Sequence, residues 1–284
     1  VHTQSVKTGM PCTLDEIADR IAALCRSLAQ AAQTPLEQMA WIGVGAPGSG
    51  DKDTGVVEYA NNLEFYNVPL GAMLRTRLGL PVYVDNDANA AALGEAKFGA
   101  SAVYESSIFI TLGTGVGGGI IVGGKMLEGY MSAGAEIGHM ILREGGALCG
   151  CGRHGCFECY ASATALIRQT KKKMEDNCDS KMWEVARNSL DNVDGRTAFE
   201  AARQGDKDAQ EVVKKYVGYL SEGIADLVNI LRPEAIVLGG GIANEGEALF
   251  VPLRKAVDER SYISSAVVPL KIVGAKLGND AGMY

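Results

Sequence analysis

Segment 133–162 combines potential metal ligands with a glycine-rich loop, and it restricts the folds open to this chain more than any other feature of the sequence. Its soft donors are one imidazole and three thiols: His139, Cys149, Cys151 and Cys156. Three thiolates and one imidazole complete the four-coordinate shell that Zn²⁺ takes in structural sites. Because a closed shell leaves no position for a reactive water, the cluster predicts a structural zinc ion and not a hydrolytic one.

Two alternatives to this ligand set remain open. The thiols could be ordinary reduced cysteines beside a hydrogen-bonded histidine, although the chain has only three histidines and one of them falls within this group. Cys159 also lies nearby and could replace one of the three thiols. We prefer Cys149, Cys151 and Cys156 because they share the glycine-rich loop.

The composition indicates a globular α/β protein with one large domain or two, since 47% of the 284 residues are hydrophobic and 36 are glycine. Its seven cysteines, four clustered and three scattered, do not resemble a secreted disulfide framework. We see no charged leader or long apolar run and expect a cytoplasmic protein without a membrane partner. The net charge of −7 argues against a nucleic-acid surface, and the lysine run 171–173 is interpreted as the solvated end of a helix.

Hydrophobic periodicity and turn residues predict an alternation of helices and strands. The predicted helices are 14–32, 70–78, 88–98, 161–173, 182–187, 197–203, 208–231 and 245–258. The predicted strands are 40–46, 81–84, 107–112, 235–238 and 269–273, with a turn at 47–50. Thr13 and Glu16 form a capping box at the start of the first helix, and Gly79 stops the second. Strand, helix, strand order predicts a mainly parallel sheet.

The polar triplet Asp85, Asn86 and Asp87 follows a short strand and precedes a helix. Asp87 could be a plain N-cap, which is the commonest task of an aspartate at such a junction. It could also be functional, because two carboxylates and an amide converge at the carboxyl end of a strand, where open α/β sheets place their ligands. Both interpretations stay open at this point.

Two glycine segments could expose backbone N–H groups to an anion. Residues 113–118 fit the spacing GxGxxG, but an apolar β run follows where a dinucleotide fingerprint requires a helix, so we predict a hairpin that cradles phosphate. Residues 239–241 lie between a predicted strand and a helix. They could approach a nucleotide or form a close helix-sheet packing turn.

These motifs together resemble the ROK family of sugar kinases, repressors and uncharacterised proteins. The resemblance rests on residues 85–91 (DNDANAA), 113–120 (GTGVGGGI), 134–139 (GAEIGH), the cysteine loop 149–158 and residues 238–242 (LGGGI). Residues 158–162 (ECYAS) look most like the bacterial glucokinases of the family. The likeness extends over nearly the whole chain.

The resemblance implies an α/β, actin-like (ribonuclease H-like) fold with two domains, 1–105 and 106–284, and a central cleft. It implies a hexose kinase for which glucose is the expected substrate, with Asp87 as catalytic base. Sugar would be bound by Asn62, Asn86, Asp87, Glu136, His139 and Glu158. ATP with Mg²⁺ would use Gly113, Thr114, Gly115 and Gly117 together with Gly239, Gly240 and Gly241. A homodimer is the default expectation for such a protein.

The family also begins with an Asp-x-Gly-Gly-Thr phosphate loop and ends with a further helix, and this sequence shows neither before 14 or after 282. We therefore expect little turnover from residues 1–284 alone. A second hypothesis is a sugar-sensing repressor of the same family, whose helix-turn-helix domain would lie upstream of this sequence. The retained Asp87 and the two glycine segments favour the enzyme.

Overall fold

The computed structural model describes residues 2–9, 11–60 and 63–283. The chain forms two compact units, which we call the N-terminal and C-terminal units. The N-terminal unit comprises the described residues up to Ala90, the segment Glu128–Gly134 and Met283, and the C-terminal unit comprises Ala91–Leu127 and Ala135–Gly282. The division between the two units falls between Ala90 and Ala91, within one helix. The domain boundary expected after residue 105 stays a prediction.

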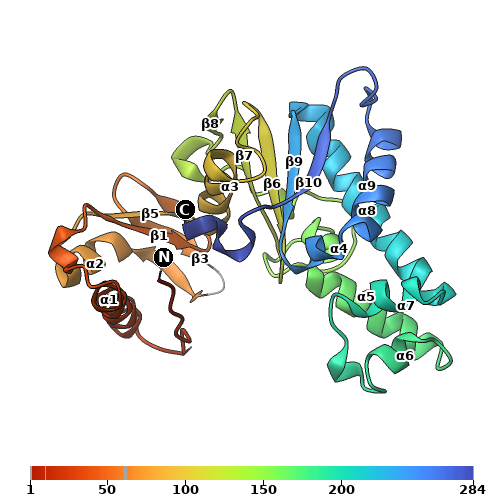
Figure 1. The fold of residues 1–284 in the computed structure, drawn as a ribbon, viewed down its shortest axis with the longest axis horizontal. Coiled ribbons are helices and arrows are strands. Elements are labelled where there is room, and N and C mark those ends of the chain that lie inside the picture. Colours follow the sequence, from red (N-terminus) through yellow and green to blue (C-terminus); the bar gives the residue numbers. More distant parts are fainter. Residues whose placement is uncertain (1, 10, 61–62, 284) are drawn as a thin grey trace. The chain divides into compact units, whose positions relative to one another are not determined.

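The N-terminal unit packs two helices against short strands (Figure 1). Its elements are α1 (Leu14–Ala31), η1 (Leu36–Gln38), β1 (Ile42–Ala46), β2 (Ser49–Asp51), β3 (Val56–Ala60), β4 (Phe65–Val68), α2 (Leu70–Leu78), β5 (Val82–Asn86), the start of α3 (Asp87–Phe98) and η3 (Tyr130–Ser132). Strands β1 and β5 pair in parallel, and β2, β3 and β4 form an antiparallel meander. Ile17 of α1, Leu74 of α2 and Phe65 of β4 share the buried core.

Local sequence signals set the ends of both helices in this unit. Glu16 N–H donates to Thr13 Oγ1 at 3.2 Å and Thr13 N–H donates to the Glu16 carboxylate at 2.7 Å, which confirms the predicted capping box. Helix α2 ends at Leu78 because Gly79 takes a left-handed conformation, with φ of 69°.

The C-terminal unit is built on a five-stranded sheet with the order β10-β9-β6-β7-β8 (Figure 1). Its strands are β6 (Ser107–Leu112), β7 (Val116–Val122), β8 (Lys125–Met126), β9 (Ala235–Gly239) and β10 (Lys271–Gly274). Strands β6, β9 and β10 run parallel, whereas β6, β7 and β8 form an antiparallel meander. Every residue of β9 is buried, as expected for a central parallel strand.

Helices bury the apolar side chains of this sheet, including Ile108, Leu112 and Ile236. They are α4 (Glu158–Ala161), α5 (Ala163–Asp176), α6 (Met182–Val185), α7 (Thr197–Arg203), α8 (Lys207–Leu231) and α9 (Glu247–Arg260), with short turns η4 (Ile137–His139), η5 (Leu190–Asn192), η6 (Gly241–Glu245) and η7 (Gly278–Met283). The long helix α8 packs against α5, α7 and α9. No helix in the described parts of the chain is long and apolar enough to cross a bilayer.

Two expectations from the sequence are wrong. The strand pairing is not mainly parallel, because the meander β6-β7-β8 makes the five-stranded sheet mixed and β2-β3-β4 form a separate antiparallel sheet. Residues 47–50 are not simply a turn, since Ser49 and Gly50 begin β2 and pair with β3. The predicted hairpin after β6 is confirmed, with Leu112 opposite Val116.

Candidate active site

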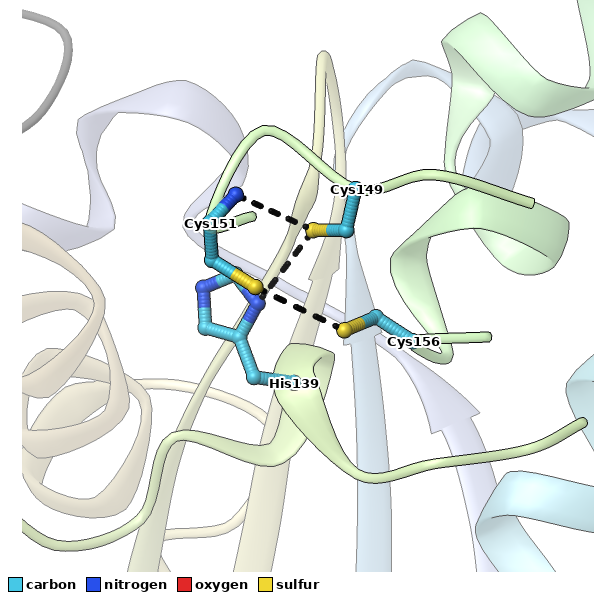
Figure 2. A group of neighbouring side chains, drawn as sticks. All are labelled: His139, Cys149, Cys151 and Cys156. Carbon is cyan, nitrogen blue, oxygen red and sulfur yellow. Dashed lines mark hydrogen bonds between the residues drawn. The ribbon is translucent and has the colours of Figure 1, made fainter. Parts of the chain in front are cut away.

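Four predicted metal ligands come together in the C-terminal unit (Figure 2). The donor atoms of His139, Cys149, Cys151 and Cys156 all lie within 4.8 Å of one another. Cys149 and Cys156 are buried, His139 is half-buried and Cys151 is exposed. The group therefore extends from two buried thiols to the surface, which it reaches at Cys151.

The spacing of these atoms fits a tetrahedral cation. Zn–S bonds of about 2.3 Å place the sulfurs of a tetrahedral site about 3.8 Å apart. The Sγ atoms of Cys151 and Cys156 are separated by 3.7 Å, and Cys149 Sγ lies 3.7 Å from His139 Nδ1. The cluster thus has both the chemistry and the spacing of a structural zinc site, with Nδ1 as the histidine donor.

The backbone of the cysteine loop fixes these positions. Isolated β-bridges pair Ile141 with Cys156 and Leu148 with His154. Gly155 has φ of 86°, and a Cβ at this position would overlap the carbonyl oxygen of Arg143. Only glycine therefore allows the two sides of the loop to approach this closely.

The protein environment raises the pKa of two of the three thiols and lowers the pKa of the third. Burial raises the pKa of Cys149, and the hydrogen bond from its thiol to Glu158 adds to that rise. Burial also raises the pKa of Cys156. Burial acts against ionisation of Cys151 as well, but the Arg153 N–H and the neighbouring thiols outweigh it and lower the pKa. Because a metal binds thiolates, cation binding here must release protons from the buried pair.

Glu158 connects the Cys₃His cluster to the first glycine segment. Its Oε1 accepts a hydrogen bond from Cys149 Sγ at 2.9 Å and lies 3.9 Å from His139 Nδ1. A Cβ on Gly115 would overlap Glu158 Oε2, so the carboxylate lies directly against the glycine backbone. Glu136 begins the turn η4, where its carbonyl accepts from His139 N–H at 3.0 Å, and its side chain is exposed.

Asn86 and Asp87 belong to the N-terminal unit, where strand β5 meets helix α3. Asn86 Oδ1 accepts from the N–H groups of Ala88 and Asn89 at 2.8 and 3.0 Å, which is the N-cap pattern. Its Nδ2 donates to the carbonyl of Gly48 at 2.8 Å. Asn86 is therefore the cap, and the interpretation of Asp87 as a plain N-cap is wrong.

Asp87 occupies the first helical position of α3 and is exposed. Its Oδ1 accepts from Ala88 N–H at 2.8 Å. Asp85 lies in β5 and accepts from Asn86 N–H at 2.7 Å. Asn62, the remaining predicted sugar ligand, lies outside the described residues.

The two glycine segments follow neighbouring parallel strands of the C-terminal unit, since Thr111 of β6 pairs with Gly239 of β9. Gly113 N–H donates to Gly115 O at 3.1 Å in the turn of the hairpin, Thr114 is exposed at its tip and Gly117 pairs with Thr111. Both segments thus lie at the carboxyl ends of strands, where open α/β sheets bind ligands.

The second segment has a packing role at two of its three glycines. A Cβ on Gly239 would press on the ring of Phe109, and Gly240 has φ of 85°, where a Cβ would overlap the Leu112 carbonyl. A Cβ on Gly241 would meet no heavy atom within 4 Å among the described residues, so packing does not explain this glycine. Of these three glycines, Gly241 therefore has the backbone that is most open to a ligand.

Sequence reasoning missed one side chain that supports the cluster. Tyr160 accepts a hydrogen bond through its hydroxyl from Ala147 N–H at 2.8 Å, and so ties α4 to the start of the cysteine loop. Ala147 and Tyr160 are 13 positions apart in the sequence, so no local sequence pattern indicates this hydrogen bond.

Fold and site together define an α/β protein with glycine segments at strand ends and a Cys₃His cluster beside them. The sequence profile of the ROK family matches residues 1–284, and the chain belongs to the ROK family. It is 39% identical over 249 residues to a glucokinase of Thermotoga maritima, covering 87% of this chain and 78% of the relative. It is also 34% identical over 258 residues to a xylose repressor of Caldicellulosiruptor bescii, covering 90% of this chain and 63% of the repressor.

Among solved structures, the chain is similar to a ROK family glucokinase from Streptomyces griseus in complex with glucose and AMPPNP. The TM-score is 0.84 and the identity 36%, covering 96% of this chain and 86% of that chain. The chain therefore has the fold of the ROK sugar kinases, which confirms the expected fold class.

Proposed function

We propose that this protein is an ATP-dependent hexose kinase that converts glucose to glucose 6-phosphate in the cytoplasm. The observation that carries the proposal is the 39% identity to a glucokinase over 87% of the chain. The similarity to a glucokinase bound to glucose and AMPPNP supports the same substrate pair. A homodimer is the expected assembly.

Sugar recognition is assigned to side chains that can accept or donate hydrogen bonds to hydroxyls. They are Asn62, Asn86, Glu136, His139 and Glu158. Carboxylates accept from neighbouring hydroxyls, and two fixed carboxylates would define the orientation of the hexose ring. Glu158 supports this role because Cys149 and the backbone of Gly115 restrict its position.

Asp87 is assigned as the general base. Phosphoryl transfer to a sugar requires a carboxylate that takes the proton of the attacking hydroxyl, while the remaining catalysis is positioning and charge neutralisation. Asn86 satisfies the capping N–H groups of α3, so Asp87 is not needed as the cap. Its exposed carboxylate is available to a substrate.

The nucleotide is assigned to the glycine segments. Backbone N–H groups that no side chain covers can bind phosphate oxygens, and Mg²⁺ would accompany the phosphates and neutralise their charge. The assigned residues are Gly113, Thr114, Gly115, Gly117, Gly239, Gly240 and Gly241. Packing among the described residues accounts for neither Gly113 nor Gly241, because a Cβ at either position would meet no heavy atom within 4 Å.

Zinc is assigned to His139, Cys149, Cys151 and Cys156. When bound, the ion would supply structural cross-linking of the loop and no reactive water. His139 presents Nδ1 to the thiols. Its Nε2 is then the nitrogen that carries the proton and can donate to a sugar oxygen, so metal binding would select the tautomer that recognition needs.

The test is ADP release from Mg-ATP with a panel of hexoses, measured on residues 1–284 and on a longer protein with the family's phosphate loop restored. Activity with glucose, at least in the longer protein, is expected. Glucose binding without turnover in either protein would contradict the proposal.

A sugar-sensing repressor is the second candidate function, favoured by the 34% identity to a xylose repressor that is considerably longer than the matched region. Such a protein would bind DNA through a domain upstream of this sequence. A helix-turn-helix segment in the encoding gene, together with sugar-dependent DNA binding and no ADP release, would establish this function.

A further inference from the structure

A surface cavity of 490 Å³ lies in the C-terminal unit between the cysteine loop, helix α8 and the end of helix α9. We call it the α8 cavity. Leu142 and Arg143 line it from the segment that precedes the cysteine loop, and Lys215, Gly218 and Tyr219 line it from α8. None of these residues has a role in the proposed sugar, nucleotide or zinc sites.

The α8 cavity is positively charged in a chain whose net charge is −7. Arg143, Lys215 and Arg260 contribute three cations and Glu222 one carboxylate. Arg260 Nε donates to Glu222 Oε2 at 3.0 Å, which neutralises that pair. Within 2–9, 11–60 and 63–283, neither Arg143 nor Lys215 forms an ion pair, so the cavity holds two uncompensated cations.

The Arg143 side chain is held in an orientation that can bind an anion. The Arg143 guanidinium carbon lies 5.2 Å from the centroid of the Tyr219 ring, a cation–π contact that limits its conformations. A guanidinium held on an aromatic face keeps its N–H groups free to form paired hydrogen bonds with a phosphate. The ammonium of Lys215 on α8 adds a second charge to the same cavity.

Packing within the fold does not explain why position 218 is a glycine. A glycine within a helix destabilises it, because the unfolded chain has more conformational freedom to lose. Gly223 on the same helix has a packing reason, since a Cβ there would lie 2.5 Å from the Phe157 ring. In the described structure, a Cβ on Gly218 would meet nothing within 4 Å beyond its own helix and chain neighbours. The space beside Gly218 is therefore available to a group from outside the chain.

We propose that the α8 cavity binds a small anion carrying a phosphate group, either inorganic phosphate or a sugar phosphate. Arg143 and Lys215 bind the phosphate oxygens, and the missing side chain at Gly218 leaves room beside them. The volume of 490 Å³ lies within the range of small-molecule pockets and accommodates a sugar phosphate.

Occupancy of this site acts on the cysteine loop, because the backbone of Arg143 is hydrogen-bonded to it. Arg143 N–H donates to Gly155 O at 3.2 Å, and Arg143 O accepts from Gly146 N–H at 3.1 Å. The Tyr219 ring also lies 5.0 Å from the ring of Tyr160, which holds Ala147. An anion that holds Arg143 and Tyr219 together therefore orders the cysteine loop.

The test is calorimetric titration of the whole chain with inorganic phosphate and, separately, with glucose 6-phosphate, in the presence of saturating glucose and AMPPNP. Binding of at least one anion is expected, and the comparison of the two identifies the source of the phosphate. The variant Lys215→Glu should weaken binding at least tenfold. The matched control Lys214→Glu makes the same charge change at an exposed neighbouring position that does not line the cavity, and should leave affinity unchanged.

A second variant, Gly218→Asp, places a carboxylate in the cavity and should also weaken binding at least tenfold. Absence of binding, or equal loss in the Lys214 and Lys215 variants, would overturn the proposal. So would a change in molecular mass by sedimentation in either cavity variant, because the cavity would then be a contact between two copies of this chain. Kinase activity enters none of these readouts, so failure of the proposed function leaves the result interpretable.

Discussion

The Cys149 thiol donates a hydrogen bond to Glu158 Oε1 over 2.9 Å, which joins the metal cluster to a carboxylate assigned to the sugar. A cation at the cluster would take the thiolate of Cys149 and end this hydrogen bond. The carboxylate of Glu158 would then have its acceptor capacity available for a hydroxyl. Metal content and sugar affinity should therefore change together.

Zinc content gives the first prediction. Protein purified without chelator should contain about one zinc per chain, because the donors form a complete tetrahedral set. Cys156→Ser should abolish most of this content, lower the melting temperature and raise the KM for glucose. Plasma mass spectrometry and thermal unfolding measure the first two effects.

Cys159→Ser is the matched control for this variant. Cys159 is buried beside the cluster but is not among the four residues whose donors converge. The control should keep its zinc. Loss of zinc in Cys159→Ser with retention in Cys156→Ser would show that the ligand set has been assigned wrongly.

The close contact between Gly115 and Glu158 gives a second prediction. Gly115→Ala places a methyl group where Glu158 Oε2 now lies, and such overpacking typically costs about 1–3 kcal/mol. We expect a lower free energy of unfolding and a higher KM for glucose. Gly113→Ala serves as control, because a Cβ there meets no heavy atom within 4 Å among the described residues. Equal effects of both changes in urea denaturation would contradict the argument.

The cap of α3 gives a third prediction. Asn86→Ala removes the acceptor of the Ala88 and Asn89 N–H groups and should lower the free energy of unfolding by about 1 kcal/mol. Asn86→Asp keeps the acceptor but loses the donor to Gly48 O. The aspartate variant should therefore be the more stable of the two, and denaturant titrations of both can be compared directly.

The assignment of Asp87 gives a fourth prediction. Asp87→Asn keeps the size of the side chain but cannot accept the proton of the attacking hydroxyl, so kcat should fall by roughly 10²–10⁴-fold. Calorimetry should show glucose affinity within a few-fold of the unchanged protein. Turnover near the original rate would mean that another group is the base.

Elements with strong local signals could be predicted from the sequence. The capping box of Thr13 and Glu16 and the stop at Gly79 locate α1 and α2 because both act through neighbouring residues. The hairpin after β6 could also be predicted, since an apolar β run follows the glycines where a dinucleotide site requires a helix.

Elements that depend on distant partners could not be predicted. Strand β2 has only three residues, Ser49–Asp51, none of them apolar, and exists because β3 supplies its hydrogen bonds. The capping role of Asn86 could not be predicted either, because it also depends on a distant partner. Its neighbour Asp87 has equal propensity for a cap, and the contact that fixes Asn86 reaches back to Gly48.

In the candidate site, the sequence could indicate the cysteine cluster because its ligands are close along the chain. The position of Glu158 against Gly115 depends instead on the packing of α4 on the hairpin. No spacing rule connects these residues, so their contact required the folded structure.

Helix α3 belongs to the N-terminal unit up to Ala90 and to the C-terminal unit from Ala91 onward, and Glu128–Gly134 returns to the N-terminal unit. A fragment ending at Ala90 would keep only the first turn of α3. It would also lose Glu128, whose carboxylate lies 2.5 Å from the ammonium of Lys52. The two units are therefore poor candidates for separate expression, and a protease nick within α3 would damage both of them at once.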